Sequence, residues 1–203
     1  MTREPNAWEL RLRENPDHSQ WYVERFRSMA AAGEDIVGEA RTIDAMLPRG
    51  SRVLDAGCGP GRLGGYLHGA GHTVVGVDYD PALIEAANVD RPGPTWLAGD
   101  LADLDLPAAG IADPFDVIVC AGNVMTFLAP STRTEVLRRM GAHLADGGRL
   151  VVGFGAGRDY SFDDFRRDAA DAGLREVLLL ESWDLEPFTD GSGFLVAILR
   201  RAT

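Results

Sequence analysis

One stretch of the sequence decides the fold: Val53-Leu54-Asp55-Ala56-Gly57-Cys58-Gly59-Pro60-Gly61-Arg62. Its apolar start is typical of a buried strand. Glycine at every second position from 57 to 61 allows a tight turn and lets a ligand approach the backbone. Residues 62–70 carry apolar side chains at helical spacing, and Gly71 is placed to end that helix. A strand, a glycine loop and a helix N-terminus together predict a site for a polar or anionic small molecule.

The remainder of the chain alternates between strand and helix patterns. Further strands are predicted at 72–78, 95–100, 115–123 and 149–154. The segments 174–183 and 193–200 predict an antiparallel hairpin at one edge of the sheet. The sequence therefore predicts an α/β fold with a doubly wound (Rossmann-like) seven-stranded mixed sheet, helices on both faces and an antiparallel C-terminal hairpin.

The first 34 residues differ from this pattern. Residues 1–18 are polar and contain two prolines, which indicates an irregular arm. Ser19 can cap a helix that carries Tyr22 and other aromatic side chains and ends at Gly33. Two interpretations of this helix stay open: it packs on the core, or it is a lid over a ligand. We therefore divide the chain into an arm and lid helix, 1–34, and a single globular domain, 35–203.

Composition excludes several function classes. Against 20 Lys+Arg stand 31 Asp+Glu, so the net charge of -11 disfavours nucleic acid and anionic membranes as partners. All the basic residues are arginine, which excludes a Schiff-base or P-loop lysine. Cys58 and Cys120 lack metal-type spacing, so no metal is expected and both are interpreted as small packing residues. Without a signal peptide or a long apolar run, we expect a cytoplasmic protein.

A dinucleotide is one candidate ligand for the glycine loop. Gly59-Pro60-Gly61-Arg62-Leu63-Gly64 matches the pattern GxGxxG, and Asp78 lies near the distance expected for a ribose-binding acid. However, Asp55 places a negative charge just ahead of the loop, where two phosphates would have to bind. About 200 residues also leave little room for the separate substrate domain of most dehydrogenases.

The ordered set of motifs resembles the class I S-adenosylmethionine-dependent methyltransferases, in particular those acting on small molecules. Residues 53–61 look like their glycine motif, and Asp78 is similar to the acid that ends their second strand. Gly99-Asp100-Leu101 and 115–119 resemble their third-strand and fourth-strand motifs, and the C-terminal hairpin is similar to their reversed last strand. The resemblance covers about residues 35–200. It implies S-adenosylmethionine as cofactor and S-adenosylhomocysteine as product.

The resemblance also implies roles for individual residues. Asp55 would fix the loop and the amino-acid end of the cofactor, and Asp78 would accept both ribose hydroxyls. Asp100 would accept from the adenine amino group, while the backbone N–H of Leu101 meets a ring nitrogen. The glycines and Ala121 would let the backbone approach the methionine portion and the ribose. The implied cofactor-binding residues are Asp55, Gly57, Cys58, Gly59, Gly61, Asp78, Tyr79, Asp100, Leu101 and Ala121.

The resemblance implies methyl transfer by in-line displacement. The Asn-Pro-Pro-Tyr-type signature of enzymes that methylate DNA bases and glutamine side chains is absent after the fourth strand, which together with the charge favours a small-molecule acceptor. No residue stands out as a catalytic base. Side chains expected to line the acceptor pocket are Tyr22, Asn123, Asp159 and Tyr160. A non-catalytic S-adenosylmethionine-binding sensor or partner protein stays open as an alternative, as does an NAD-dependent oxidoreductase. We expect a monomer or a homodimer.

Overall fold

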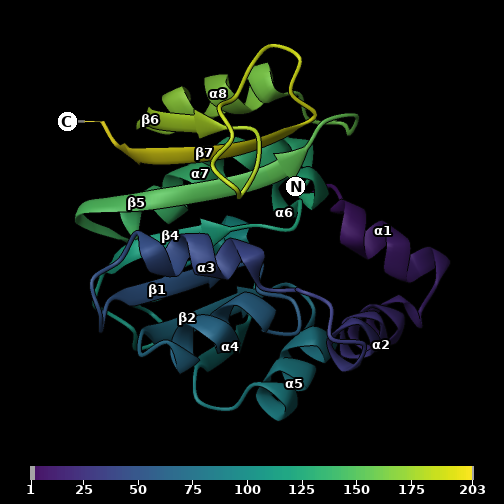
Figure 1. Cartoon of the computed structure of the whole chain (residues 1–203). Helices are drawn as coiled ribbons and strands as arrows, with labels where there is room; N and C mark the ends of the chain where they lie inside the picture. Colours follow the sequence, from purple (N-terminus) through teal and green to yellow (C-terminus); the bar gives the residue numbers. More distant parts are fainter. Residues whose placement is uncertain (1–2, 203) are drawn as a thin grey trace.

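A seven-stranded mixed sheet forms the centre of the computed structural model, which describes residues 3–202 (Figure 1). Its strands are β1 (Arg52–Ala56), β2 (Thr73–Asp78), β3 (Thr95–Ala98), β4 (Phe115–Cys120), β5 (Leu144–Gly155), β6 (Leu174–Leu180) and β7 (Phe194–Arg201). They lie in the order β3-β2-β1-β4-β5-β7-β6. Strands β1 to β5 pair in parallel, whereas β7 is antiparallel to both β5 and β6. The predicted doubly wound sheet with a C-terminal hairpin is confirmed.

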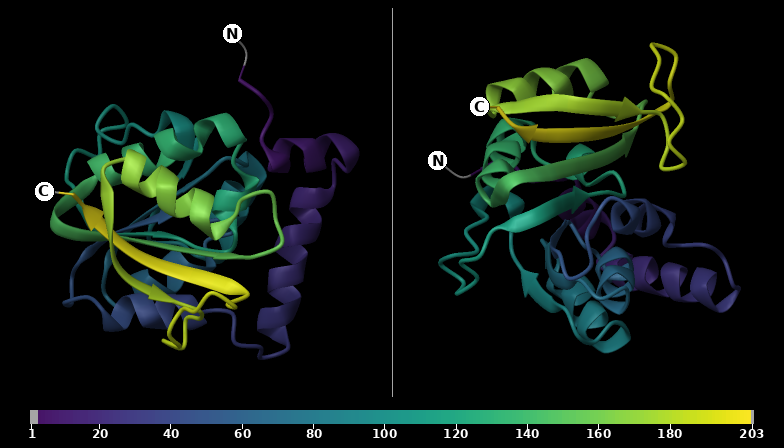
Figure 2. Two further views of the ribbon diagram at one scale, coloured as in Figure 1. Left: turned by 90° about the horizontal axis from the view of Figure 1, so that it is seen from above. Right: turned by 60° about the vertical axis from the view of Figure 1, so that its left-hand side comes forward.

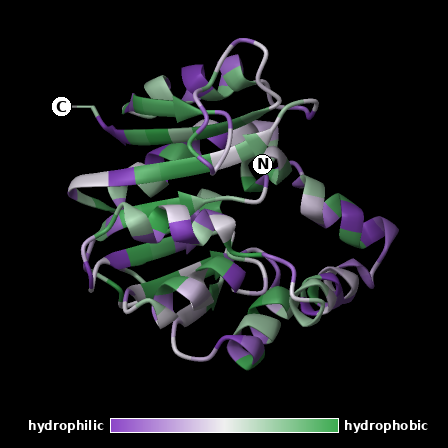
Figure 3. Cartoon of the chain, in the orientation of Figure 1, coloured by the Kyte–Doolittle hydropathy of each residue, from purple (hydrophilic) through white to green (hydrophobic). Residues whose placement is uncertain are grey.

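Helices cover both faces of the sheet. On one face α3 (Gly38–Ala45) and α4 (Arg62–Gly69) pack against alternate residues of β1, β2 and β4. On the other, α7 (Arg133–Ala142) and α8 (Phe162–Asp171) cover the larger core cluster. Helix α5 (Pro81–Asp90) lies on the same face as α4, where its Ala87 packs with Trp96 of β3. The strands are the most hydrophobic segments of the chain (Figure 3), as expected for strands that are buried on both faces.

The N-terminal helices α1 (Ala7–Glu14) and α2 (His18–Ala31) lie beyond the carboxyl ends of the parallel strands, where β5 also ends (Figures 1 and 2). A capping box starts α1: Asn6 accepts from the backbone N–H of Glu9 at 2.8 Å, and the Glu9 side chain accepts from the N–H of Asn6 at 2.9 Å. The prediction of an irregular arm is therefore wrong for residues 7–14. Residues 1 and 2 of that arm lie outside the described residues.

Two further details differ from the sequence-based expectations. Strand β5 begins at Leu144 rather than at residue 149, because Asp146-Gly147-Gly148 continues the strand through an irregularity in its pairing with β4. After β4 the chain forms the short helix α6 (Val124–Phe127) and the 3₁₀ turn η2 (Pro130–Thr132), and another such turn, η1 (Leu101–Asp103), follows β3. These short elements place side chains of the site.

The indole of Trp96 in β3 explains why three positions of the fold have room only for glycine. Trp96 is 7% exposed, and a Cβ built at Gly61, Gly64 or Gly76 would lie 2.9, 2.7 or 2.3 Å from its ring. Gly76 lies inside β2 in a conformation that any residue can adopt, so its requirement for glycine is purely one of space. The packing of the β2–β3 edge depends on this close approach.

We expect Gly76→Ala to lower the free energy of unfolding by about 1–3 kcal/mol, because the added methyl overpacks against the indole. Urea denaturation measures this change. The matched control is Gly69→Ala at the end of α4, where a Cβ has open space and alanine favours the helix. An unchanged stability of Gly76→Ala would contradict the packing role of Trp96.

Candidate cofactor site

A cavity opens at the carboxyl ends of β1, β2, β3 and β4, the edge at which open α/β sheets bind ligands. The loops after these strands form one side of it, and residues of α1, α2 and α6 complete it. The cavity brings together nine of the ten predicted cofactor residues: Asp55, Gly57, Cys58, Gly59, Asp78, Tyr79, Asp100, Leu101 and Ala121.

Gly61, the tenth predicted residue, is not among the lining residues of the cavity. It has a left-handed conformation with φ of 76° at the start of α4, which favours glycine. Its α-carbon faces Trp96, and a Cβ there would lie 2.9 Å from the indole. In the structure this glycine therefore allows the turn and the packing of Trp96, rather than a direct approach to the cavity.

Asp55 caps the helix that follows the glycine loop. It is 3% exposed, and its Oδ2 accepts from the backbone N–H of Gly64, in the first turn of α4, at 2.9 Å. The residue at the N-cap, Gly61, has no side chain for this task. The helix N-terminus that would bind a dinucleotide phosphate is thus already paired with a carboxylate of the chain. Burial raises the pKa of Asp55 to about 7, although the bond from Gly64 and the nearby Arg62 oppose this shift.

Asp78 fastens the glycine loop to the end of β2. Its Oδ2 accepts from the N–H of Gly59 at 2.8 Å, and its Oδ1 accepts from the N–H of Asp80 at 3.0 Å. The N–H groups of Gly57 and Cys58 donate to the carbonyl of Val77 at 2.8 and 3.1 Å. Burial nevertheless raises the pKa of Asp78 to about 6. This carboxylate both shapes the loop and lines the cavity.

Asp100 follows β3 and caps the turn η1, because its Oδ1 accepts from the N–H of Ala102 at 2.8 Å. Its Oδ2 lies 3.0 Å from the guanidinium of Arg3, which also pairs with Asp103 at 2.8 Å. Arg3, four positions ahead of the start of α1, thus reaches across to the end of β3. Glu4 next to it accepts from both the N–H and the hydroxyl of Ser131, at 2.9 and 2.7 Å.

Asp80 links both N-terminal helices to the sheet. It is 4% exposed, and its Oδ1 caps α5 by accepting from the N–H of Ala82 at 2.9 Å. Its Oδ2 accepts from the indole N–H of Trp8 in α1 at 2.9 Å and from the hydroxyl of Ser19 in α2. Asp80 lies two residues after Asp78, so this connection fixes α1 and α2 directly beside the cavity.

Aromatic side chains line the part of the cavity formed by the N-terminal helices and α6. They are Trp8, Tyr22, Phe26 and Phe127. The placement of Tyr22 at the pocket is confirmed, and its ring lies over the glycine loop, 3.7 Å from where a Cβ of Gly59 would be. The sequence did not predict Trp8 and Phe127 as pocket residues. The capping box at Asn6 could have revealed α1 and hence Trp8, but a four-residue helix such as α6 leaves no periodic signal.

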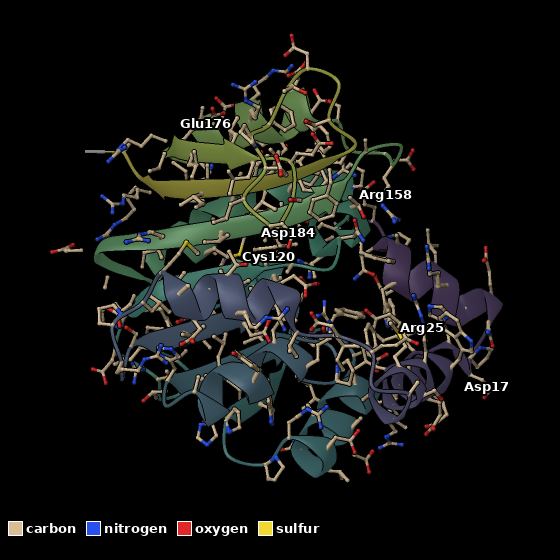
Figure 4. The ribbon with its side chains drawn as sticks, in the orientation of Figure 1. Asp17, Arg25, Cys120, Arg158, Glu176 and Asp184 are labelled. Carbon is tan, nitrogen blue, oxygen red and sulfur yellow. The ribbon has the colours of Figure 1, made fainter. Side chains whose placement is uncertain are left out.

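The other three side chains expected in the acceptor pocket lie elsewhere. Tyr160 is 2% exposed, stacks on Phe154 with ring centroids 5.7 Å apart, and donates its hydroxyl to Asp168 at 2.7 Å. Asn123 accepts from the N–H of Gly155 at 2.8 Å, which ties the ends of β4 and β5 together. Asp159 is exposed in the loop after β5, next to the outward-pointing Arg158 (Figure 4). None of the three lines the cavity, so their prediction as pocket residues is wrong.

Both cysteines are buried, as predicted. Cys58 packs with Ile84, Ala87 and Trp96, and Cys120 lies inside the sheet (Figure 4). Burial raises the pKa of both thiols, so neither is a ready thiolate nucleophile. Within residues 3–202 no cluster of histidine, cysteine and acidic side chains could hold a metal ion. No helix in that range is long and apolar enough to cross a membrane.

The raised pKa values of Asp55 and Asp78 have a consequence for stability. Aspartates of the unfolded chain titrate near pH 4, so between that pH and about 7 the folded protein holds these protons more tightly. The stability that they contribute is fully present below about pH 4 and is lost as the pH rises through about 6 and 7. We expect the free energy of unfolding, measured by urea denaturation, to fall between pH 5 and pH 8. Asp55→Asn should flatten this fall, and a wild-type stability that rises over this window would contradict the burial of the two acids.

Comparison with known proteins defines the class. A family model described as a methyltransferase domain matches residues 53–148. The crystal structure of a TehB-like S-adenosylmethionine-dependent methyltransferase from Corynebacterium glutamicum is 51% identical, has a TM-score of 0.86, and is matched over 92% of this chain and 100% of that one. A protein from Mycolicibacterium smegmatis named a probable S-adenosylmethionine-dependent methyltransferase is 31% identical over 140 residues, 68% of this chain. The chain spans 53% of the length of that relative.

The fold, the motifs and the nearly complete match to the Corynebacterium glutamicum structure agree. The chain belongs to the class I S-adenosylmethionine-dependent methyltransferase family. Its cofactor is S-adenosylmethionine. A magnesium protoporphyrin IX methyltransferase from Synechocystis, crystallised with this cofactor, shares the fold with a TM-score of 0.62 at 20% identity. The GxGxxG match is therefore not a dinucleotide fingerprint, in keeping with the carboxylate of Asp55 at the helix N-terminus.

Proposed function

We propose that this methyltransferase binds S-adenosylmethionine in the cavity at the strand ends and transfers its methyl group by in-line displacement to a small molecule. The observation that carries the proposal is the gathering of Asp55, Asp78 and Asp100 with the glycine loop in one cavity. A cofactor with a sulfonium, an amino group and no phosphate suits a site rich in carboxylates. When bound, the cofactor supplies an electrophilic methyl group.

The residues of the chain fit the parts of this cofactor in the order of the strands. Asp78 is placed for the ribose, since a carboxylate can accept from two hydroxyls while it keeps the loop bonds. In this proposal Asp100 and the N–H of Leu101 contact the adenine edge. Asp55, Gly57, Cys58, Gly59 and Ala121, which all line the cavity, contact the methionine portion, and Tyr79 contacts the ribose side. The positively charged cofactor favours ionised acids, so its affinity should rise with pH over the window in which Asp55 and Asp78 titrate.

The N-terminal helices act as a lid in this proposal. They contribute Trp8, Tyr22 and Phe26 to the cavity, and the rest of the domain holds them through Asp80. A closed lid excludes water and fixes the nucleophile in line with the methyl carbon, and such alignment can lower a barrier by roughly 7–11 kcal/mol. The net charge of -11 supports a small molecule rather than nucleic acid as acceptor.

The experiment that tests this function measures S-adenosylhomocysteine by mass spectrometry. The protein is incubated with S-adenosylmethionine and pools of acceptors sorted by class: small molecules, peptides and nucleic acids. We expect product only with small-molecule pools. Product with the nucleic-acid pool would contradict the assigned acceptor class. Tight binding of the cofactor without product in any pool would instead identify a non-catalytic binding protein.

A further inference from the structure

The aromatic side chains of the cavity form one continuous row. The ring of Phe127 lies 5.8 Å from that of Trp8, Trp8 lies 5.3 Å from Tyr22, and Tyr22 lies 5.0 Å from Phe26, measured between centroids. All four side chains are partly exposed. The only polar atom of Trp8, its indole nitrogen, already donates to Asp80. Arginines already lie over the two end rings: Arg11 over Phe127 at 4.9 Å and Arg62 over Phe26 at 5.4 Å. The row therefore offers its remaining π faces, above all those of Trp8 and Tyr22, to whatever binds between α1, α2 and α6.

The charge of the cavity is negative. Three carboxylates line it, those of Asp55, Asp78 and Asp100, and one positive side chain, Arg62. Arg62 is committed elsewhere: it pairs with Glu39 through both terminal nitrogens, at 2.8 and 2.6 Å, and donates to the carbonyl of Ile36. Arg3 pairs with Asp100 at 3.0 Å, which leaves Asp55 and Asp78 as the acids of the cavity without an arginine partner. Above pH 7, where both are ionised, a singly positive cofactor neutralises only part of their charge. An anionic acceptor is repelled, whereas a cationic or neutral one is accepted.

Among residues 3–202, no side chain that lines the aromatic part of the cavity could remove a proton near neutral pH. His18, whose ring centroid lies 4.9 Å from that of Trp8, is not among the lining residues. Val124 and Leu128 complete its lining, and both are apolar. Its one titratable group is the phenol of Tyr22, and burial raises the pKa of that group further. Asn6 is occupied with capping α1. The acceptor must therefore bring a lone pair that attacks without help from a protein base.

From the aromatic row, the negative charge and the missing base, we infer that the acceptor is a small amine carried on a flat apolar body. This inference rests on the proposed function. Aromatic faces together with carboxylates attract an alkylammonium, and the flat apolar body packs on the same rings whether or not the amine is protonated. Thiolates, phenolates and carboxylates carry the charge that the cavity rejects, and neutral hydroxyls need a base to react.

The reaction balances without a further reactant. The lone pair of the free amine forms the new N–C bond as the C–S bond of the sulfonium breaks, and the electrons of that bond go to sulfur. The products are S-adenosylhomocysteine and a methylated ammonium ion, which loses its proton to solvent. The titratable side chains that line the cavity are Tyr22, Asp55, Cys58, Arg62, Asp78, Tyr79 and Asp100.

Four probes that share one apolar body test the inference: benzylamine, benzyl alcohol, phenylmethanethiol and phenylacetate. Each is titrated by calorimetry into the protein saturated with S-adenosylhomocysteine, and each is assayed for turnover with S-adenosylmethionine. We expect benzylamine to bind and to react at least about tenfold faster than the others, with no binding of phenylacetate. Its kcat/KM should rise about tenfold per pH unit below the pKa of the amine itself, while aniline, already unprotonated, shows a flat profile.

Aromatic variants separate binding from chemistry. Phe127→Leu keeps an apolar side chain but removes a π face, so the KM for benzylamine should rise about fivefold with kcat nearly unchanged. The matched control is Phe188→Leu, which changes an aromatic side chain that packs on Phe162 away from the cavity. Equal effects of the two variants would contradict the role of the row.

Provided that S-adenosylhomocysteine still binds, three results would overturn the inference. The protein could prefer phenylmethanethiol or phenylacetate to benzylamine, or it could fail to bind benzylamine. The third result is that Tyr22→Phe loses turnover while benzylamine still binds. The last result would identify Tyr22 as a base. If S-adenosylhomocysteine itself fails to bind, the proposed cofactor site fails instead. The two failures are therefore distinguishable.

Discussion

Asp78→Ala is expected to raise the Kd for S-adenosylmethionine at least about a hundredfold. The carboxylate accepts from the N–H groups of Gly59 and Asp80, and in the proposed complex it also accepts from the ribose hydroxyls. Hydrogen bonds to a charged group contribute about 1.5–3 kcal/mol each, and loss of two of them amounts to a factor of about a hundred or more. Calorimetric titration measures the change.

The control for this experiment is Asp103→Ala. Asp103 is an exposed carboxylate that pairs with Arg3 close to the site but does not line the cavity. We expect the Kd of this variant for S-adenosylmethionine to stay within about threefold of that of the wild type. The circular dichroism spectrum of each variant shows whether it is folded. Cofactor binding by a folded Asp78→Ala variant with wild-type affinity would place the ribose elsewhere.

Asp80→Ala is expected to lower the free energy of unfolding by about 2–4 kcal/mol and to loosen both N-terminal helices. The substitution removes the cap of α5 and leaves the indole N–H of Trp8 and the buried hydroxyl of Ser19 without their acceptor. Urea denaturation measures the stability. Trypsin measures the loosening, because α1 and α2 carry several arginines as cleavage sites.

A second acidic residue provides a matched control for the lid. Asp90 also joins α5 to α2, through a bidentate pair with Arg27 at 2.9 and 3.0 Å, but this pair lies at the surface. We expect Asp90→Ala to cost less than about 1 kcal/mol and to leave the tryptic pattern unchanged. If α1 and α2 of Asp80→Ala resist trypsin as well as those of the wild type, another contact holds the two helices in place.

Long periodic segments made most of the fold predictable. The apolar run that ends at Asp55, the glycine loop and the βαβ unit up to Asp78 determine strand order and handedness, and the ligand edge of the sheet follows from them. The acids at the ends of β1, β2 and β3 were therefore placed correctly at one cavity from sequence position alone. Parallel strands bring their carboxyl ends together whatever the loops between them do.

Side-chain direction in loops was not predictable in the same way. Tyr160 follows β5 as expected, but the following turn directs its ring into the core, where Phe154 and Asp168 hold it. Gly61 belongs to the glycine motif, yet the residue that requires it is Trp96, 35 positions later in the chain. Contacts between residues distant in sequence decide both cases, and local pattern carries no information on them.

The acceptor side of the site was the least predictable. Its aromatic row combines α1, which was mistaken for an irregular arm, with α2 and the four-residue helix α6. Asp80 holds Trp8 beside the end of β2 through a bond between residues 72 positions apart, and Trp8 and Tyr22 also pack on Val23, Leu83 and Ala86. The aromatic row thus depends on tertiary contacts of the N-terminal segment, whereas the gathering of the three acids depends on the sheet.

Hydrogen exchange with and without S-adenosylhomocysteine tests the central claim most directly, because it reports on every loop at once. We expect the ligand to slow exchange in the glycine loop 57–61, in the segments after β2 and β3 around Asp78 and Leu101, and in the lid helices α1 and α2. The loop 181–193 between β6 and β7 should stay unchanged. Binding without protection at these strand ends, or with protection confined to other parts of the chain, would contradict the assignment of the cofactor site.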